Sequence, residues 1–511
     1  MFFLKIAKIG NNHLISWPTR YYTIIMEDNT IFQGNQEVSQ PQRGLNTPTD
    51  QNIAPPLPPT PPPVSTSALT LPPDYSDGSG SRLMTFAKIL LGLFVVILII
   101  SLIYFLVLPR FGQKKTEKVT LTYWGLWEDQ KIMDSVLSDF EKANPNITVE
   151  YSKQDPKQYA DRLKTRIENG NGPDIFRFHN TWYPVLSSYL LPISSEVVSA
   201  KDFKKWYYPV MQKDLIKNGV VYGVPLGVDT LALYINEDLF SSAGINPPIT
   251  WEDFASMSAV LTVKDETGKI KTAGAAMGSF DNIAHSPDLI SLLFVQSGIN
   301  PTDILSKKTK VAEALSFYTS FALGDNDSVW DNTLDNSTRA FAAGTVGMYF
   351  GYSWDYFMIK AMNPNLKFKV VSVPQLANQN KTVASYWVEG ASLKSKYQKE
   401  ALLLLKFLSQ KSTAEKLYAE QSKTRLFGEP YARIDLADKL KDSLAYPFII
   451  GARNSTSSFF ADSTYETSYN GAMNEYLKTA VNSIIIQRTS PDTAVDTLIK
   501  GVTQVLGKYG Q

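Results

Sequence analysis

Two short segments combine tryptophan with side chains that form hydrogen bonds. They are residues 124–128 (WGLWE) and residues 179–183 (HNTWY). An indole ring has an apolar face, whereas Asn, Glu and His offer polar atoms beside it. This combination suits a ligand with apolar faces and a polar rim, such as a sugar ring, although any one of these tryptophans could equally pack the end of a sheet. The candidate binding residues here are Trp124, Trp127, Asn180 and Trp182.

Another aromatic pair follows a predicted strand later in the chain. The apolar residues 347–350 favour a strand, and Tyr352 and Trp354 come shortly after it. Trp354 would stack on a ring face of the ligand unless it fills the sheet end as a core residue. Both residues are therefore candidates for the same kind of site.

Alternating strands and helices must position the first four candidates. Strands are predicted over 119–123, 147–151 and 174–178, and amphipathic helices over 128–143 and 158–168. This alternation implies a parallel sheet with right-handed crossovers. Ligands of such sheets bind beyond the carboxyl ends of the strands, where both tryptophan segments are expected to lie.

One uncharged apolar segment divides the chain. The run from Ile89 to Leu108 has about the 20-residue length that crosses a bilayer core. The preceding residues are rich in Pro, Gln, Asn, Ser and Thr, a composition that cannot offset the entropy of ordering. We therefore predict a disordered Pro-rich tail over 1–82, a transmembrane helix over 83–109 and a body over 117–511. Met26 is an alternative start within the tail.

The charges beside the apolar segment do not by themselves place the body outside the cell. Arg82 and Lys88 lie on the N-terminal side of the segment, whereas four basic residues lie on its C-terminal side, from position 110 to position 118. Lys and Arg favour the cytoplasmic side in short loops, but large domains translocate largely regardless of charge. The nature of the body therefore decides the predicted orientation.

Composition argues against several classes of protein. The net charge of +1 argues against nucleic-acid binding. The chain has no Cys, which excludes disulfides, thiolate chemistry and a lipid-modified Cys anchor. Its three His are too scattered for a closely spaced metal site, and no phosphate-binding loop or nucleophile elbow is present. We expect no metal, no cofactor and no enzymatic activity.

Several segments of the body, in order, resemble a known family. Residues 223–240 (GVPLGVDTLALYINEDLF) resemble the central segment of extracellular solute-binding proteins of the maltose-binding type, which are carbohydrate ABC transporter substrate-binding proteins of family 1. Further matching stretches are residues 172–175 (GPDI), 243–254 (AGINPPITWEDF) and 341–348 (FAAGTVGM) followed by 351–354 (GYSW). The resemblance runs from about residue 118 to the C-terminus.

The resemblance implies an α/β fold of the two-lobe, type II periplasmic-binding-protein-like kind, with a hinge that closes on a ligand. Lobe 1 would comprise about 117–228 and 374–422, and lobe 2 about 234–373 and 424–511. The first crossing would fall at Asp229 to Tyr234 and the last near Lys423. The resemblance also implies that Asp229 accepts hydrogen bonds from the ligand and that Trp387 meets the cleft from the returning strand.

The resemblance implies a function in solute capture. We expect a monomeric receptor on the extracytoplasmic side of the cytoplasmic membrane that binds a sugar or oligosaccharide and delivers it to ABC permease subunits. Most relatives are released or held by a lipidated Cys, whereas this chain would keep its span in the lipid bilayer. The alternatives are a sensory or adhesive surface protein, an enzyme acting on polysaccharide, and a binder of another polar solute such as a peptide or polyamine, because fold alone does not fix function.

Overall fold

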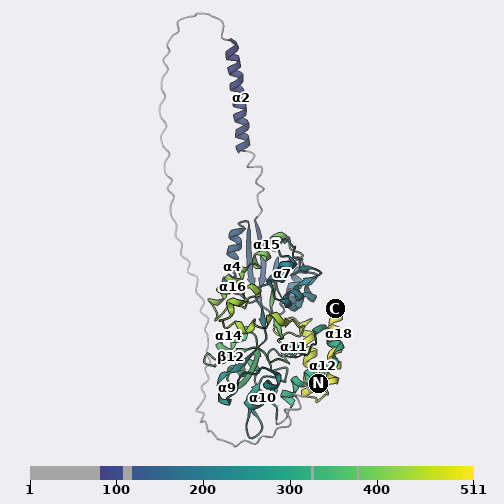
Figure 1. Cartoon of the computed structure of the whole chain (residues 1–511). Helices are drawn as coiled ribbons and strands as arrows, with labels where there is room; N and C mark the ends of the chain where they lie inside the picture. Colours follow the sequence, from purple (N-terminus) through teal and green to yellow (C-terminus); the bar gives the residue numbers. More distant parts are fainter. Residues whose placement is uncertain (1–80, 107–117, 324–326, 377–378, 511) are drawn as a thin grey trace, which may run out of the picture. The chain divides into compact units, whose positions relative to one another are not determined.

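The computed structural model describes residues 81–106 and 118–510, apart from 324–326 and 377–378 (Figure 1). Within these residues, the helix α2 and the body belong to two separate compact units. The predicted Pro-rich tail lies outside the described residues, except for its last two positions.

Helix α2 (Ser81–Leu106) covers most of the predicted transmembrane segment. The residues Ala87–Tyr104 of this helix have a mean hydropathy of 2.7 and are not buried inside the structure. The helix is long and apolar enough to cross a bilayer, which agrees with the sequence prediction in length and composition.

Lobe 1 of the body is built on a five-stranded sheet with the order β2-β1-β3-β14-β6. Its strands are β1 (Val119–Gly125), β2 (Ile147–Lys153), β3 (Ile175–His179), β6 (Val224–Pro225) and β14 (Trp387–Ala391). The predicted parallel pairing of β1 with β2 and β3 is confirmed. Strand β14 runs antiparallel to β3, so the first residue of β14 lies beside the carboxyl end of β3.

Lobe 1 also contains helices, of which Gln130–Ala143 and Gln398–Leu408 contact this sheet. The helices are α4 (Gln130–Ala143), α5 (Tyr159–Glu168), α6 (Tyr183–Leu186), α7 (Ala200–Trp206), α8 (Pro209–Leu215), α15 (Gln398–Leu408) and α16 (Lys411–Ser422), with the short pair β4 (Ile216–Lys217) and β5 (Val220–Val221) after α8. Helix α4 forms because Met133, Val136, Leu137 and Phe140 recur at helical spacing and are all buried.

Lobe 2 is built on a second five-stranded sheet with the order β12-β8-β11-β10-β9. Its strands are β8 (Ala232–Asn236), β9 (Val263–Lys264), β10 (Ile270–Ala275), β11 (Val346–Gly351) and β12 (Phe368–Val371). Its helices are α9 (Glu237–Ala243), α10 (Trp251–Leu261), α11 (Ser286–Gln296), α12 (Lys308–Leu323), α13 (Ser337–Ala342), α14 (Ser353–Met362), α17 (Asn470–Ile485) and α18 (Pro491–Lys508).

Residues 250–254 (TWEDF), part of a segment that resembles the family, contribute to the core of lobe 2. Helix α10 begins with a capping box in which Thr250 and Asp253 exchange hydrogen bonds. The next residue after the cap, Trp251, is fully buried and packs against Phe254 and Phe350, with ring centroids 5.4 and 5.8 Å away. The TWEDF stretch therefore starts a helix and fills the core at the same time.

A small three-stranded sheet with the order β15-β13-β7 connects the lobes. It consists of β7 (Asp229–Thr230), β13 (Thr382–Ser385) and β15 (Ser455–Thr456). Strand β7 leads directly into β8 of lobe 2, and β13 leads back into β14 of lobe 1. In Figure 1, α4, α15 and α16 lie together towards one end of the body and α9, α10 and β12 towards the other.

The chain after α16 contacts both lobes. Arg425 and Phe427 pack against Phe357 of α14 in lobe 2. The later 3-10 turn Ile434–Leu440 contacts α7 of lobe 1, and the turn Ala452–Asn454 contacts α8. The last crossing near Lys423 therefore stays a prediction.

Candidate functional site

An aromatic cluster lies at the carboxyl ends of the lobe 1 strands. Trp127 follows β1 and is 38 % exposed, and its ring centroid lies 5.4 Å from that of Trp387 in an edge-to-face arrangement. Trp387 opens β14 and pairs in register with His179, the last residue of β3. This is the sheet edge at which ligands of parallel sheets bind. The fold therefore brings together two candidate residues that are far apart in the sequence.

Tyr465 joins this cluster from another part of the chain. Its side chain is 47 % exposed, and its ring centroid lies 6.3 Å from that of Trp127. It belongs to residues 457–469, the irregular segment between β15 and α17, which we call the strap. No sequence pattern points to Tyr465, because it follows no predicted strand and lies in none of the quoted stretches that match the family.

The backbone of the strap holds Tyr465 in a defined direction. Ser463 and Tyr465 have φ values of 58° and 56°, a left-handed conformation that costs about 1–2 kcal/mol for a residue other than glycine. The carboxylate of Glu466 accepts the backbone N–H groups of Tyr469 at 2.7 Å and Asn470 at 2.8 Å, at the start of α17. Such strained conformations persist only where surrounding contacts impose them.

Trp182 supports the cluster from the protein interior. It is buried, and its ring centroid lies 5.4 Å from that of Trp387. Its indole N–H donates to Oδ1 of Asn470 at 3.0 Å, which links lobe 1 to α17 of lobe 2. His179 lies edge-on to Trp387 at 5.1 Å, and burial lowers its pKa to about 3, so this imidazole is neutral.

A second aromatic pair lies at the start of α14 in lobe 2. Trp354 stacks on Tyr352, with centroids 4.5 Å apart and an interplanar angle of 21°. Tyr352 is buried, and its hydroxyl donates to Oδ1 of Asp288 at 2.8 Å. Trp354 is only half-buried, so it retains surface that a ligand can cover, whereas Tyr352 supports it from behind.

Asp229 connects the hinge to the N-terminus of α14. Its Oδ2 accepts the backbone N–H of Ser353 at 2.9 Å and also accepts the hydroxyl of that residue. Burial raises the pKa of Asp229 well above its ordinary value, while the hydrogen bonds from Ser353 act in the opposite direction. Oδ1 is buried and has no hydrogen-bond partner among the described residues.

Asn180 and Trp124 lie near the cluster but are not part of it. Asn180 donates through Nδ2 to the hydroxyl of Ser457 at 2.8 Å, and its Oδ1 accepts the backbone N–H of Tyr386 at 3.2 Å. Trp124 is half-buried, with its ring centroid 6.4 Å from that of Tyr159. Direct ligand contact stays a prediction for the buried candidates Asn180, Trp182, Asp229 and Tyr352.

Glu128 follows Trp127 but is engaged in a buried ion-pair network. Arg177 contacts Glu128 through Nη1, and its Nε donates to Glu389 at 2.6 Å. Gln421 donates to the second oxygen of Glu128 at 3.0 Å. Burial opposes the charge on Arg177, but the two glutamates raise its pKa well above the ordinary value. Glu128 is therefore occupied within the protein.

The side chains described above have the chemistry that solute binding needs. They offer half-exposed aromatic faces from both lobes and an unpaired carboxyl oxygen at the hinge. In the described parts of the chain, no group of three or more His, Asp or Glu side chains is arranged to hold a metal ion. The arrangement can cover apolar ring faces and accept a hydrogen bond.

Comparisons with known proteins identify the family. Residues 135–425 match the model of the bacterial extracellular solute-binding protein family. The multiple sugar-binding protein of Streptococcus mutans is 25 % identical over 330 residues, which cover 60 % of this chain and 75 % of that protein. A putative binding protein of Brucella abortus is 25 % identical over 292 residues, covering 54 % of this chain and 68 % of its own length.

Solved structures show the same fold. The sugar-binding protein MalE of Xanthomonas citri superposes with a TM-score of 0.62 at 19 % identity, covering 76 % of this chain and 98 % of that one. A Thermotoga lettingae solute-binding protein bound with α-D-tagatose has a TM-score of 0.58 at 22 % identity, covering 76 % and 100 %. These proteins bind solutes and are not enzymes, and the two-lobe α/β fold predicted from the sequence is confirmed. The chain belongs to the family of bacterial extracellular solute-binding proteins.

Proposed function

We propose that the body captures a carbohydrate on the aromatic cluster formed by Trp127, Trp387 and Tyr465. The observation that carries this proposal is the exposure of Trp127 and Tyr465, which are 38 % and 47 % exposed although their rings are neighbours. Covering exposed aromatic surface with an apolar face is favourable. The C–H face of a sugar ring is such a surface, and its hydroxyls remain free to form hydrogen bonds.

Lobe 2 contributes the opposite side of the proposed site. Trp354 offers a second stacking surface, and Oδ1 of Asp229 is an unpaired acceptor at the hinge. The hinge strands allow the lobes to close and bury a bound solute. Sugar binding by several relatives, among them proteins with maltotetraose and mannotriose bound, supports this ligand class.

We further propose that the receptor works beside an ABC permease on the extracytoplasmic face of the cytoplasmic membrane. Helix α2 has the length and composition of a membrane anchor, and the chain has no Cys to carry a lipid. An anchored monomer would stay close to the permease, whereas a released receptor must diffuse to it. Membership of an extracellular binding family supports this orientation of the body.

A sugar that binds the folded body is expected to raise its melting temperature. At a hundredfold excess over its Kd, a ligand adds about 2.7 kcal/mol to the free energy of unfolding. A thermal-shift screen of the full chain in detergent, with maltotetraose, mannotriose, α-D-tagatose and a panel of other sugars, tests this.

Replacement of Trp387 by alanine should weaken binding of the active sugar by roughly ten- to hundredfold, as expected for a central aromatic contact.

Trp206→Ala is the matched control for the Trp387→Ala variant. Trp206 is also half-buried in lobe 1, but it packs under the guanidinium of Arg433 at 4.9 Å, and neither residue belongs to the proposed site. This variant should bind the active sugar as the parent does. An equal loss in both variants would contradict the aromatic cluster, and the absence of any response to the whole panel would contradict the carbohydrate proposal.

Protease added to intact spheroplasts is expected to digest the body. The physical reason is that a single span, α2, would place the body on the side opposite the tail, and the family is extracellular. Immunoblots against both ends of the chain measure this, with a cytoplasmic protein as the control for leakage. A protected body with a cleaved tail would overturn the orientation and the proposed delivery to a permease.

A further inference from the structure

Three exposed apolar side chains lie close together in the sequence after β14. Leu393 and Tyr397 belong to the turn that leads into α15, and Leu403 lies on α15 itself; they are 43 %, 36 % and 44 % exposed. The side-chain amide of Gln398 donates to the carbonyl oxygen of Leu393 at 2.7 Å, which holds the turn against the start of the helix. Single exposed apolar residues are common, so it is their surroundings that distinguish these three.

The same segment is rich in exposed lysines. Residues 393–406 contain one acidic residue, Glu400, and four lysines. The four are exposed and form no ion pair with a carboxylate in the described part of the chain: Lys394, Lys396, Lys399 and Lys406. Lys399, Leu403 and Lys406 recur at spacings of four and three residues, which places them on one face of α15. We call the exposed side chains of residues 393–406 the pole patch.

The pole patch lies at the end of lobe 1 from which the first strand starts. The carboxylate of Asp174 accepts the backbone N–H and the hydroxyl of Thr122 through Oδ2, both at 2.9 Å. Its Oδ1 accepts the hydroxyl of Ser395, within the patch segment, at 2.5 Å. Strand β1 begins at Val119, only three residues before Thr122. One buried carboxylate therefore joins the patch segment to the first strand near its amino end.

The length of the connection to α2 limits how far this end of lobe 1 can be from a membrane. Residues 107–117 join Leu106, the last residue of α2, to Lys118, and even a fully extended chain of this length covers only about 40 Å. This limit holds for any placement of the helix and the body. Three residues of the connection are basic, namely Arg110, Lys114 and Lys115. A bilayer spanned by α2 therefore has the patch end of lobe 1 tethered beside it.

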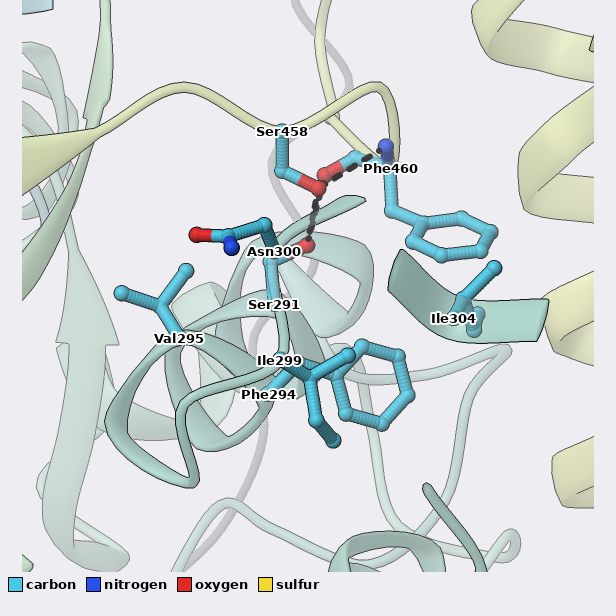
Figure 2. Close-up of a pocket in the computed structure, with 8 residues that line it drawn as sticks. All are labelled: Ser291, Phe294, Val295, Ile299, Asn300, Ile304, Ser458 and Phe460. Atoms are coloured by element: carbon cyan, nitrogen blue, oxygen red, sulfur yellow. Dashed lines mark hydrogen bonds between the residues drawn. The ribbon is translucent and has the colours of Figure 1, made fainter. Parts of the chain in front are cut away.

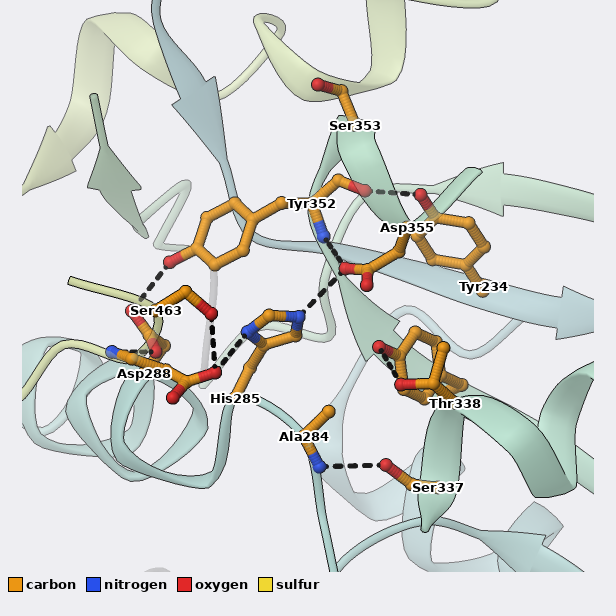
Figure 3. A network of polar contacts seen from close by, with 12 residues as sticks. Tyr234, Ala284, His285, Asp288, Ser337, Thr338, Tyr352, Ser353, Asp355 and Ser463 are labelled. Atoms are coloured by element: carbon orange, nitrogen blue, oxygen red, sulfur yellow. Dashed lines mark hydrogen bonds and ion pairs between the residues drawn. The ribbon is translucent and has the colours of Figure 1, made fainter. Parts of the chain in front are cut away.

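Two other features of lobe 2 that could receive a partner are small or already satisfied. A small cavity between α11 and the strap is lined mostly by apolar side chains, and the hydroxyl of Ser291 donates to that of Ser458 there at 2.8 Å (Figure 2). The polar cluster at the start of α14 is buried, and Asp288 accepts the hydroxyl of Tyr352 (Figure 3). The pole patch, in contrast, presents both its apolar and its charged groups to solvent.

We propose that the pole patch is a membrane-docking surface, on which the lysines bind the anionic headgroups of phospholipids while Leu393, Tyr397 and Leu403 enter the interface beside them. This rests on the proposed anchoring of the chain by α2. Lysine can lay its carbon chain along apolar surface and keep its ammonium group among the headgroups, and tyrosine favours the same depth. Tethering raises the effective concentration of the body at the bilayer, so a small patch is sufficient.

Docking through the pole patch leaves the candidate binding site accessible. The patch segment lies near the amino end of β1, whereas Trp127 follows the carboxyl end of that strand. A strand of this length extends for about 20 Å. The docked body would therefore hold the aromatic cluster away from the lipid, and sugar binding should not depend on the patch.

A spin label at one of two positions measures docking in the full chain. The chain has no Cys, so Leu403→Cys places a nitroxide, itself apolar, within the patch. Val260→Cys places it on α10, where the replaced side chain is 63 % exposed; in Figure 1 this helix lies towards the other end of the body from α15. In vesicles of phosphatidylcholine and phosphatidylglycerol, the label at position 403 should be shielded from a water-soluble nickel chelate and accessible to oxygen. The label at position 260 should remain accessible to the chelate.

The shielding should depend on charge. It should be lost in vesicles of phosphatidylcholine alone and in about 1 M NaCl, where the Debye length falls to about 3 Å. Replacing the four patch lysines together by Gln should lower the docking equilibrium constant by several hundredfold, at about fivefold per lysine. These side chains are exposed, so the variant should fold as the parent does.

The matched control makes the same change of charge in lobe 2. It replaces four exposed lysines of that lobe by Gln: Lys269, Lys310, Lys369 and Lys500. This variant should keep the label at position 403 shielded. Equal accessibility at positions 403 and 260, shielding that ignores lipid charge, or an equal loss in both variants would overturn the proposal. Shielding in native membranes but not in lipid vesicles would assign the patch to an acidic protein surface and would overturn it as well.

Flotation and sugar binding separate this proposal from the proposed function. The parent and the patch variant should both float with vesicles, because α2 alone is sufficient for anchoring. Failure of the parent to float would overturn the anchor and the docking with it. The Kd for maltotetraose, or for another active sugar of the panel, should be the same in both. If no sugar binds while the label responds as expected, the carbohydrate proposal fails and the docking surface stands.

Discussion

Replacement of Arg177 by methionine is expected to lower the free energy of unfolding of the body by about 3–5 kcal/mol. The guanidinium is 1 % exposed and lies between Glu128 and Glu389, which are 3 % and 0 % exposed. Removing the cation leaves two carboxylates close together in the interior with no countercharge. Such an uncompensated buried charge is among the most destabilising consequences of a single substitution.

Urea unfolding of the full chain in detergent, followed by tryptophan fluorescence, measures this loss. Arg339→Met is the control, because it removes an ion pair with Asp335 that is largely exposed and should change the urea midpoint little. Adding Glu128→Gln and Glu389→Gln to the Arg177 variant should restore part of the stability, since neutral side chains need no countercharge. A midpoint for Arg177→Met that matches the control would show that the buried pair does not stabilise the fold.

The secondary structure of lobe 1 could be predicted because its signals are local. The helical spacing of Met133, Val136 and Phe140 defines α4, and the predicted strand over 147–151 lies within β2. The same reasoning placed Trp127 near the ligand edge, since that edge follows from the direction of the strands, whereas the family resemblance placed Trp387 there. Both residues lie in the aromatic cluster.

The remainder of the candidate site depends on contacts that no local pattern encodes. Tyr465 lies more than three hundred residues after Trp127, and only the path of the strap brings the two rings together. Asp229 has the residue type of a ligand acceptor, but one of its oxygens is engaged by Ser353 at the start of α14. Which polar groups are already satisfied by the protein can be read only from the folded chain.

Trp182→Ala is the second substitution expected to have a large effect, with a loss of about 3–5 kcal/mol in the free energy of unfolding. Trp182 is buried, its ring contacts those of Tyr159 and Trp387, and its N–H is bonded to Asn470. The substitution leaves a cavity in lobe 1 and removes a link to α17. We expect a lower melting temperature both with and without sugar.

Trp354→Ala separates this structural effect from a loss of binding. Trp354 is half-buried and stacks on Tyr352, so its removal should cost much less stability than removal of Trp182 but should weaken binding of the active sugar. Melting temperatures without sugar and Kd values at neutral pH, measured on both variants, test the difference. If Trp354→Ala melts as early as Trp182→Ala, or binds the sugar as tightly as the parent, Trp354 is part of the core of lobe 2 and not of the binding surface.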